Sequence, residues 1–228
     1  MKREAEIHSQ LKHPNIIGFI DSFEENGYFY IVLEYANKGN LLDYLQKHNN
    51  ELRLTDKLQI FLKICDGLKI LHSKDILHRD LKCENVLLST DDDGCIHVKL
   101  ADFGASRDVT NVTGKLTLIG TPSYVSPELL MGKSYGKPND IWGLGCLLYV
   151  CLLFKLPFSG PNMNMHILKG QYAPIPITAN IPQCIQDMIA KIFSVNPDDR
   201  PTLDQITEQI NLFLAGPTKS PAKTTSAP

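Results

Sequence analysis

The stretch HRDLKCEN at residues 78–85 decides how the rest of this chain is interpreted. Asp80 and Lys82 stand two residues apart within it, and Asn85 closes it. A second stretch, DFG at residues 102–104, follows after two short apolar segments. Together they supply a carboxylate that can handle a proton, an ammonium group, and oxygen ligands of the kind that Mg²⁺ prefers. Phosphoryl transfer requires this set of groups.

The two stretches match, in order, the catalytic loop H-R-D-L-x-x-x-N and the metal-binding D-F-G of protein kinases. Two later segments agree with this match. GTPSYVSPE at residues 120–128 resembles the segment that positions a peptide substrate, and DIWGLG at residues 140–145 resembles the start of a large buried helix. The match extends from residue 1 to about residue 214, so the chain resembles the eukaryotic protein kinases. The resemblance implies a kinase-like α+β fold, with a mostly helical large lobe.

The resemblance also indicates a substrate class and a subfamily. Lys82 close behind Asp80, and Thr121 within the later GTP triplet, are typical of serine/threonine kinases rather than tyrosine kinases. The segments PFSGPNM at residues 157–163 and KGQY at residues 169–172 resemble those of the NIMA-related kinases. The implied function is transfer of the γ-phosphate of ATP, with Mg²⁺, to serine or threonine hydroxyls of protein substrates.

Each residue of the catalytic motifs receives a role from this resemblance. Asp80 would accept or orient the proton of the substrate hydroxyl, and Lys82 would neutralise charge on the transferred phosphate. Asn85 and Asp102 would hold the metal. Thr121 would help to position the substrate.

The segment EYA at residues 34–36 resembles the hinge that binds adenine. The carbonyl of Glu34 and the amide of Ala36 would then hold the base. Leu33 would be the gatekeeper, and Leu87 would form part of the floor beneath the base. Each of these residues is also compatible with an ordinary strand position.

One threonine and one arginine form an expected regulatory pair. Thr117 lies three residues before Gly120, which matches the position that an upstream kinase phosphorylates in many such kinases. A phosphate at Thr117 would form charge-assisted hydrogen bonds with Arg79 and order the loop. An unmodified loop threonine is the alternative.

Three charged residues are structural candidates in the same resemblance. Arg200 is expected to pair with Glu128, and Asp140 is expected to brace the catalytic loop. Removing one partner of a buried ion pair costs several kcal/mol. We therefore interpret these residues as structural rather than catalytic.

The start of the chain departs from the kinase pattern. A glycine-rich loop and a β3 lysine should precede the first long helix, which the spacing of Ile7 and Leu11 places at residues 1–12. Glu4 matches the helix glutamate that pairs with that lysine, whereas Lys2 lies on the same helix and cannot replace it. We therefore expect an N-terminally truncated kinase whose small lobe is reduced to one helix and a hairpin.

The missing segments allow an estimate of how far the activity of this chain falls below that of a complete kinase. Losing one preorganised donor removes about 3 kcal/mol of transition-state stabilisation. Losing an apolar cover of roughly 100 Å² over adenine removes about 2.5 kcal/mol of binding. Activity of this chain alone is therefore expected to be roughly thousands-fold below that of a complete kinase.

His8 is a second departure, because the family places an apolar residue there to link the helix to the DFG stretch. The alternative is a solvent-facing histidine on a loosely held helix.

Local patterns predict the elements around these motifs. The dipeptide NG at residues 26–27, between apolar runs at residues 16–23 and 28–35, predicts a β-hairpin. Thr55 is the predicted N-cap of a long amphipathic helix. Two further strands are predicted at residues 86–88 and 96–100.

The predicted domain organisation has three parts. Residues 1–35 are a remnant of the small lobe, residues 36–214 form the large lobe, and the small, polar, proline-rich residues 215–228 form a disordered tail. The segment DDDG at residues 91–94 is predicted to be a solvated turn. A calcium loop would need alternating ligands and a terminal glutamate.

Composition agrees with an intracellular protein. The net charge of -2 gives no reason to expect a nucleic-acid partner. The six cysteines have no zinc-like spacing, so we expect reduced, mostly buried thiols and a cytoplasmic location. The first residues are charged and do not resemble a signal peptide. The apolar run at residues 141–154 is shorter than the roughly 20 residues that span a membrane, so no membrane partner is expected.

Three functional hypotheses remain open from the sequence. The first is an active serine/threonine kinase, favoured by intact Asp80, Lys82, Asn85 and Asp102. The second is a catalytically impaired kinase-like scaffold or regulator, favoured by the missing phosphate-binding loop and lysine. The third is a small-molecule phosphotransferase, which the peptide-positioning segment at residues 120–128 disfavours.

Overall fold

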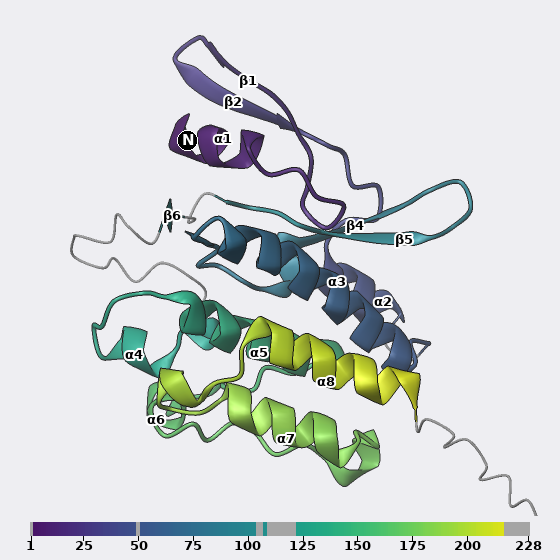
Figure 1. The fold of residues 1–228 in the computed structure, drawn as a ribbon, viewed down its shortest axis with the longest axis vertical. Coiled ribbons are helices and arrows are strands. Elements are labelled where there is room, and N and C mark those ends of the chain that lie inside the picture. Colours follow the sequence, from purple (N-terminus) through teal and green to yellow (C-terminus); the bar gives the residue numbers. More distant parts are fainter. Residues whose placement is uncertain (1, 49–50, 104–106, 109–121, 217–228) are drawn as a thin grey trace, which may run out of the picture.

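The computed structural model describes residues 2–48, 51–103, 107–108 and 122–216, in a small and a large part (Figure 1). The α-helices are α1 Lys2–Ser9, α2 Leu41–His48, α3 Leu54–Ser73, α4 Pro127–Leu130, α5 Lys137–Leu153, α6 Met163–Leu168, α7 Gln183–Ile192 and α8 Leu203–Ala215. The strands are β1 Phe19–Glu25, β2 Tyr28–Leu33, β3 Ile76–Leu77, β4 Val86–Thr90, β5 Ile96–Leu100 and β6 Arg107–Asp108. Short 3₁₀ turns are η1 Cys83–Asn85, η3 Pro122–Tyr124, η4 Ile177–Ala179 and η5 Pro197–Asp199. The expected α+β architecture is present, with one helix and one hairpin in the small part.

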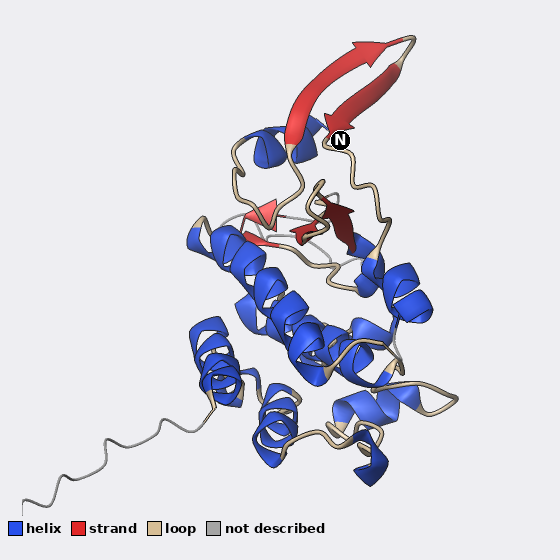
Figure 2. Cartoon of the chain, turned by 90° about the vertical axis from the view of Figure 1, so that its right-hand side faces the viewer, coloured by secondary structure: helices blue, strands red, loops and turns tan. Residues whose placement is uncertain are grey.

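The β1–β2 hairpin extends away from the helical body (Figure 2). Asn26 and Gly27 form its two-residue turn with φ values of 52° and 78°. These left-handed conformations are those of a type I′ turn, which suits the twist of antiparallel strands. The predicted hairpin is confirmed, although β1 begins at Phe19 rather than at Ile16.

The segment between α1 and β1 is fastened to β5 instead. The Ile17 N–H donates to the Leu100 carbonyl at 2.8 Å, and the Leu100 N–H donates to the Asn15 carbonyl at 2.9 Å. The Asn15 side chain donates a further hydrogen bond to the Val98 carbonyl at 2.9 Å. These bonds connect the small part to the strand that leads directly into the DFG stretch.

Helix α3 packs against β5 and α8 in the large part (Figure 1). Its apolar positions recur at helical spacing and are buried, among them Leu58, Phe61 and Leu68. The predicted N-cap at Thr55 is wrong by two residues. The N-cap residue is Arg53, and its backbone N–H donates to Asp56 Oδ2 at 3.0 Å. Asp56, at the third helical position, therefore accepts a hydrogen bond from the N-cap backbone, as in a capping box.

Helix α5 forms the centre of the large part. All residues from Asn139 to Leu152 are buried, which explains why the segment is apolar on every face. Trp142 stacks on Phe158 with ring centroids 5.2 Å apart. Within the described residues, no helix is long and apolar enough to cross a membrane.

The cysteines and the acidic turn follow the sequence predictions. All six cysteines have free thiols, and four of them are buried. In the turn, Asp91 Oδ1 accepts a hydrogen bond from the Cys95 N–H at 2.8 Å, and Asp91 Oδ2 lies 3.0 Å from His97 Nε2. Asp91 therefore closes the β4–β5 connection.

A close approach at Gly67 gives a stability prediction. A Cβ atom there would lie 2.5 Å from the Asn15 carbonyl oxygen and 3.0 Å from Leu100 Cδ1. Glycine to alanine within an exposed helix normally stabilises by about 1 kcal/mol. Gly67→Ala should instead lower the free energy of unfolding by about 1–3 kcal/mol, because a backbone oxygen must move.

Urea-induced unfolding followed by circular dichroism would measure this change. Asp66→Ala, at the adjacent exposed position of α3, is the control and should change stability by less than about 0.5 kcal/mol. A Gly67→Ala protein as stable as wild type would contradict the packing of α3 on the Asn15 segment.

Candidate active site

The catalytic-loop residues converge on the Asp80 carboxylate. Lys82 Nζ lies 2.6 Å from Asp80 Oδ2. Asn85 Nδ2 donates to the same oxygen at 2.9 Å and to the Asp80 backbone carbonyl at 2.8 Å. The 3₁₀ turn η1 positions Asn85 for these bonds, since it reverses the chain directly after Lys82. The sequence predicted all three residues, and the structure brings them together.

The second oxygen of Asp80 is in a different environment. Asp80 Oδ1 is buried and has no hydrogen-bond partner in the part of the chain that the structure describes. An unsatisfied buried acceptor costs about 1–3 kcal/mol, so this position fits a donor supplied by a ligand. A substrate hydroxyl is such a donor.

Asp102 lies beside this loop at the end of β5. The Ala101 N–H donates to the Asn85 carbonyl at 2.9 Å, which fixes the strand end against the catalytic loop. Asp102 itself is exposed and has a φ of 63°, a conformation that is strained for a residue with a side chain. Because Asn85 Nδ2 is bonded to Asp80, the planar amide directs its Oδ1 the other way.

The oxygen atoms of Asp102 and Asn85 suit a magnesium ion that is also bound by phosphates. Mg²⁺ is typically bound through one or two carboxylates together with substrate phosphates and waters. Asp102 provides an accessible carboxylate, and Asn85 provides an amide oxygen on the adjoining loop. The residues present therefore suit the metal that the family implies.

Glu4 on α1 approaches the same site. Burial raises the pKa of the Glu4 carboxyl above its ordinary value, and the negative charge of Asp102 raises the pKa further. Lys2 does not compensate this charge, because its Nζ pairs with Glu24 Oε2 at 2.9 Å. The prediction that Lys2 does not act as the partner of Glu4 agrees with this ion pair.

Asp140 braces the catalytic loop from beneath. Its carboxylate is fully buried and accepts hydrogen bonds from the backbone N–H groups of His78 and Arg79, both at 3.0 Å. It also accepts from the Tyr135 hydroxyl at 2.7 Å and lies 2.8 Å from His72 Nε2. Burial alone would raise the pKa of Asp140. The hydrogen bonds to the carboxylate, above all the one with His72, contribute to outweighing burial, and the pKa lies below its ordinary value.

The hydrogen bonds of Asp140 stabilise a strained backbone conformation at Arg79. Arg79 has a φ of 73°, and its N–H is one of the groups that Asp140 fixes. Its guanidinium carbon lies 5.1 Å from the centre of the Tyr135 ring. The resulting turn places Asp80 beyond Arg79, facing Lys82 and Asn85.

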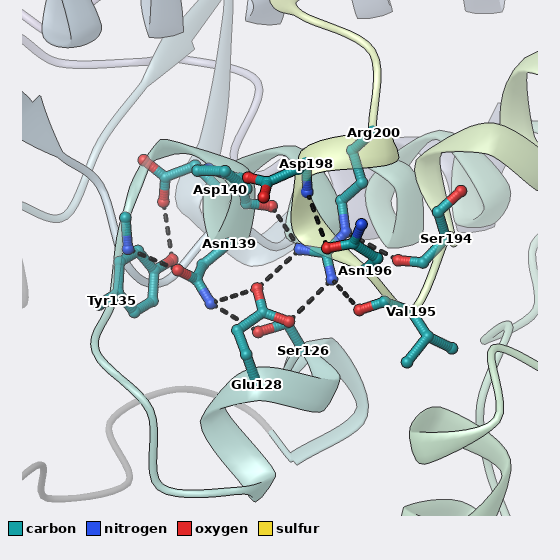
Figure 3. A network of polar contacts seen from close by, with 12 residues as sticks. Ser126, Glu128, Tyr135, Asn139, Asp140, Ser194, Val195, Asn196, Asp198 and Arg200 are labelled. Carbon is teal, nitrogen blue, oxygen red and sulfur yellow. Dashed lines mark hydrogen bonds and ion pairs between the residues drawn. The ribbon is translucent and has the colours of Figure 1, made fainter.

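Arg200 and Glu128 form the expected ion pair (Figure 3). Arg200 donates to the two Glu128 carboxylate oxygens at 2.7 and 2.8 Å, and also to the Pro138 and Ser194 carbonyls. Asn139 donates to Glu128 Oε1 at 2.7 Å. The pair joins the segment after η3 to the start of α5 and to the segment before α8, which agrees with a structural role.

Three of the four expected adenine-binding residues lie at the end of β2 and directly after it, and the fourth, Leu87, lies on β4. Leu33, Ala36 and Leu87 are partly buried and pack against the hydrophobic core. Among the described residues, no hydrogen bond engages the Glu34 carbonyl or the Ala36 N–H. Both groups fit a ligand with one donor and one acceptor, as adenine has.

The Glu34 side chain makes contacts that the sequence does not indicate. Its Oε1 pairs with Lys99 Nζ at 2.9 Å, and its Oε2 accepts from the Gly18 N–H at 2.9 Å. The hinge segment is thereby tied to β5 and to the start of β1. Lys99 was missed because it lies 65 residues from Glu34 in the sequence.

His8 is buried, so the alternative of a solvent-facing histidine is wrong. It is 2% exposed and lies with its ring edge toward Phe103, with centroids 4.7 Å apart. Phe103 contacts His78 on the catalytic loop, with centroids 5.6 Å apart. His8 therefore occupies the linking position that the family gives to an apolar residue.

Sequence reasoning missed the partners of the buried carboxylates. His72 and Tyr135 both bond to Asp140, and Asn139 bonds to Glu128. In the sequence, these three residues stand out only as polar residues within or beside an apolar helical segment. Many surface residues have the same pattern, so it does not identify buried partners. The predicted regulatory Thr117 and substrate-positioning Thr121 lie outside the described residues.

The fold and the geometry of this loop define a protein kinase domain. A family model for the protein kinase domain matches residues 1–210. The chain belongs to the protein kinase domain family. The resemblance stated from the sequence is confirmed at the level of the family.

The chain is similar to several serine/threonine-protein kinases. It is 39% identical over 211 residues to Nek5 of Homo sapiens, covering 91% of this chain and 29% of that protein. It is 38% identical over 214 residues to Nek1 of Mus musculus, covering 91% and 17%. It is 37% identical over 209 residues to PLK4 of Aedes aegypti, covering 91% and 27%. The chain thus spans less than a third of the length of these relatives, and NIMA-related kinases are among them as expected.

The Arg200 network gives a prediction for stability. Arg200→Lys should lower the free energy of unfolding by about 3 kcal/mol. One ammonium group cannot replace both the bidentate ion pair with Glu128 and the hydrogen bonds to the backbone carbonyls. Chemical denaturation would measure the loss. Arg53→Lys is the matched control, since Arg53 pairs with Asp56 at an exposed site and should change stability by less than about 0.5 kcal/mol. Equal losses for the two variants would argue against a structural role of Arg200.

Proposed function

We propose that this chain is the catalytic region of a serine/threonine protein kinase that uses ATP and Mg²⁺. The observation that carries the proposal is the asymmetry of the Asp80 carboxylate. Lys82 and Asn85 engage Oδ2, whereas Oδ1 is buried without a hydrogen-bond partner in the described residues. An acceptor held in one orientation and left open on one side suits a group that orients and deprotonates a hydroxyl.

Each residue of the site has its own role in phosphoryl transfer. ATP with Mg²⁺ supplies the activated phosphoryl group. Asp80 orients the substrate hydroxyl and accepts its proton at Oδ1. Lys82 Nζ, fixed 2.6 Å from Asp80 Oδ2, supplies positive charge beside the reacting oxygen. Asn85 and Asp102 would hold the metal.

Backbone groups of the hinge would bind the base. The Glu34 carbonyl would accept from the adenine amino group, and the Ala36 N–H would donate to a ring nitrogen. Leu33 and Leu87 provide apolar surface against the ring, which suits an aromatic base. The ion pair of Glu34 with Lys99 keeps this segment in place.

A protein substrate is favoured over a small molecule by the surroundings of η1. A pocket of about 180 Å³ lies next to the catalytic loop, lined by Leu42, Glu84, Tyr124, Val150, Phe154, Lys155 and Leu156. Its size suits one side chain of an extended peptide rather than a whole sugar or antibiotic. We propose that Thr121 positions such a peptide.

The regulatory assignments remain part of the proposal. Phosphorylation of Thr117 by an upstream kinase would place a dianion that Arg79 can bind. The free thiols of the described cysteines favour action inside the cell. Neither a nucleic-acid nor a membrane partner is proposed.

Transfer of labelled phosphate from ATP to casein or to the chain itself tests the function. Asp80→Asn should lower the rate by about 10²–10⁴-fold, because the amide cannot accept the proton. Asp102→Ala and chelation of Mg²⁺ should abolish the transfer. Asp204→Asn is the matched control, because Asp204 lies in an exposed pair with Lys69 and should leave the rate unchanged.

The two remaining hypotheses predict different outcomes. A scaffold without activity would bind ATP weakly or not at all and would show no transfer that Asp102→Ala removes. A small-molecule phosphotransferase would label a sugar or antibiotic but not casein. Equal labelling in wild type and Asp102→Ala would mean that the activity comes from a contaminant.

A further inference from the structure

A cavity in the large part of the molecule takes no part in the proposed reaction. It has a volume of about 470 Å³ and lies between the end of α3, the start of α5 and the start of α8. This volume is within the range of about 300–1,000 Å³ that is usual for small-molecule sites. Among the described residues, its lining includes none from the catalytic loop, the DFG stretch or the hinge. We call this cavity the α3–α5–α8 pocket.

Most of the pocket lining is apolar. Ile141 of α5 and Leu203 of α8 line it and are only 5% and 7% exposed. The rings of Pro138 and Pro201 add further apolar surface. Transfer of a hydrocarbon group from water to such a surface is favourable. The pocket therefore suits a ligand with an apolar body.

The charged residues of the lining are mostly cations. Lys69, Lys137 and Arg200 line the pocket, against the single carboxylate of Asp204. Arg200 already donates to both carboxylate oxygens of Glu128. The two lysines are therefore the groups that can bind the charged end of a ligand, and that end should be an anion.

Both lysines have partners that a ligand can replace. Lys69 Nζ lies 2.9 Å from Asp204 Oδ1, and Lys137 Nζ lies 2.8 Å from Asp75 Oδ1. The aspartate side chains are 89% and 67% exposed, whereas the lysine side chains are 33% and 44% exposed. Exposed ion pairs of this kind contribute little to stability. A ligand carboxylate can therefore take the place of an aspartate at little cost.

One residue of the lining belongs to the network that braces the catalytic loop. His72 lines the pocket, and its Nε2 lies 2.8 Å from Asp140 Oδ2. The same oxygen accepts a hydrogen bond from the His78 N–H at 3.0 Å. A group that packs against the His72 ring is therefore one side chain away from the carboxylate that holds the loop.

We propose that the α3–α5–α8 pocket binds a small organic anion, with its apolar body against Ile141 and Leu203 and its carboxylate between Lys69 and Lys137. Binding is coupled to the catalytic loop, because His72 connects the pocket to Asp140. The proposal goes beyond the proposed function, since no step of phosphate transfer takes place in this pocket. A carboxylate attached to two fused aromatic rings is a suitable probe of this class.

Three naphthalene derivatives of similar size separate charge from shape. Naphthalene-2-carboxylate has the expected charge, naphthalene-2-carboxamide is neutral, and 2-naphthylmethylammonium is a cation. We expect a dissociation constant of about 0.1–1 mM for the carboxylate. The amide should bind about ten-fold more weakly, because it lacks charge-assisted hydrogen bonds to the lysines. An amide that binds as tightly as the carboxylate, or a cation that binds more tightly, would overturn the proposal.

Methyl NMR of the chain with labelled isoleucine measures these affinities and locates the probe. The Ile141 signals should shift as the carboxylate is added, because an aromatic ring shifts the signals of methyl groups packed against it. Ile64 is the control, since it is buried elsewhere on α3 and does not line the pocket. Ile141 signals that do not move in the saturated complex would overturn the proposal.

Substitutions at exposed positions test the two parts of the site. Lys137→Gln should weaken binding of the carboxylate about ten-fold and leave binding of the amide unchanged. Lys133→Gln is the matched control, because Lys133 is exposed and does not line the pocket. Ser73→Trp should fill the pocket from the exposed end of α3 and abolish binding of both probes. Unchanged carboxylate affinity in Lys137→Gln or in Ser73→Trp would place the probe elsewhere and overturn the proposal.

The backbone amide of His78 reports the coupling to the catalytic loop. Its N–H donates to Asp140, so its signal in the chain with nitrogen-15-labelled histidine should shift on saturation with the carboxylate. The amide of His97, a half-exposed residue of β5, should not shift. An unchanged His78 signal in the saturated complex would overturn the coupling. None of these measurements requires phosphate transfer, so an inactive chain would contradict the proposed function while the binding data still decide this proposal.

Discussion

The buried carboxylate of Asp140 is the interaction on which the rest of the site depends. It satisfies two backbone N–H groups of the catalytic loop and two side chains from α3 and from the segment before α5. A carboxylate with no exposure to water is tolerated only when such donors surround it. The loop can therefore adopt the left-handed conformation at Arg79 that places Asp80 beside Lys82 and Asn85. Asp140 lies in the first turn of α5, a helix that is buried from Asn139 to Leu152.

Much of the fold and the site followed from the sequence where chemistry restricts the residue type. The HRDLKCEN stretch predicted that Asp80, Lys82 and Asn85 would lie together, because proton transfer and metal binding leave few substitutes for these residue types. The dipeptide at residues 26–27 predicted the hairpin because its turn needs two residues that tolerate positive φ. Helical spacing predicted α3, since one face of an amphipathic helix must be apolar.

The rest depended on contacts between distant segments. The start of α3 was misplaced because Thr55 is a good capping residue, whereas Arg53 caps through its bond to Asp56. The Lys99 partner of Glu34 and the His72 partner of Asp140 have no local signal, because ordinary charged or polar residues acquire these roles only through tertiary packing. His8 was the most ambiguous residue, since a histidine at an apolar position is compatible with both exposure and burial.

The position of α1 results from a balance between stabilising contacts and charge repulsion. An eight-residue helix is not stable in isolation, so its place is set by burial of apolar residues such as Ile7 and Leu11 and by the bond from His8 to Ile17. Against these contacts acts the repulsion between Glu4 and Asp102, which contributes to the raised pKa of Glu4. A divalent cation at Asp102 would reverse the sign of the field at Glu4 and turn repulsion into attraction. A metal held by Asp102 would therefore affect the position of α1 through the charge of Glu4.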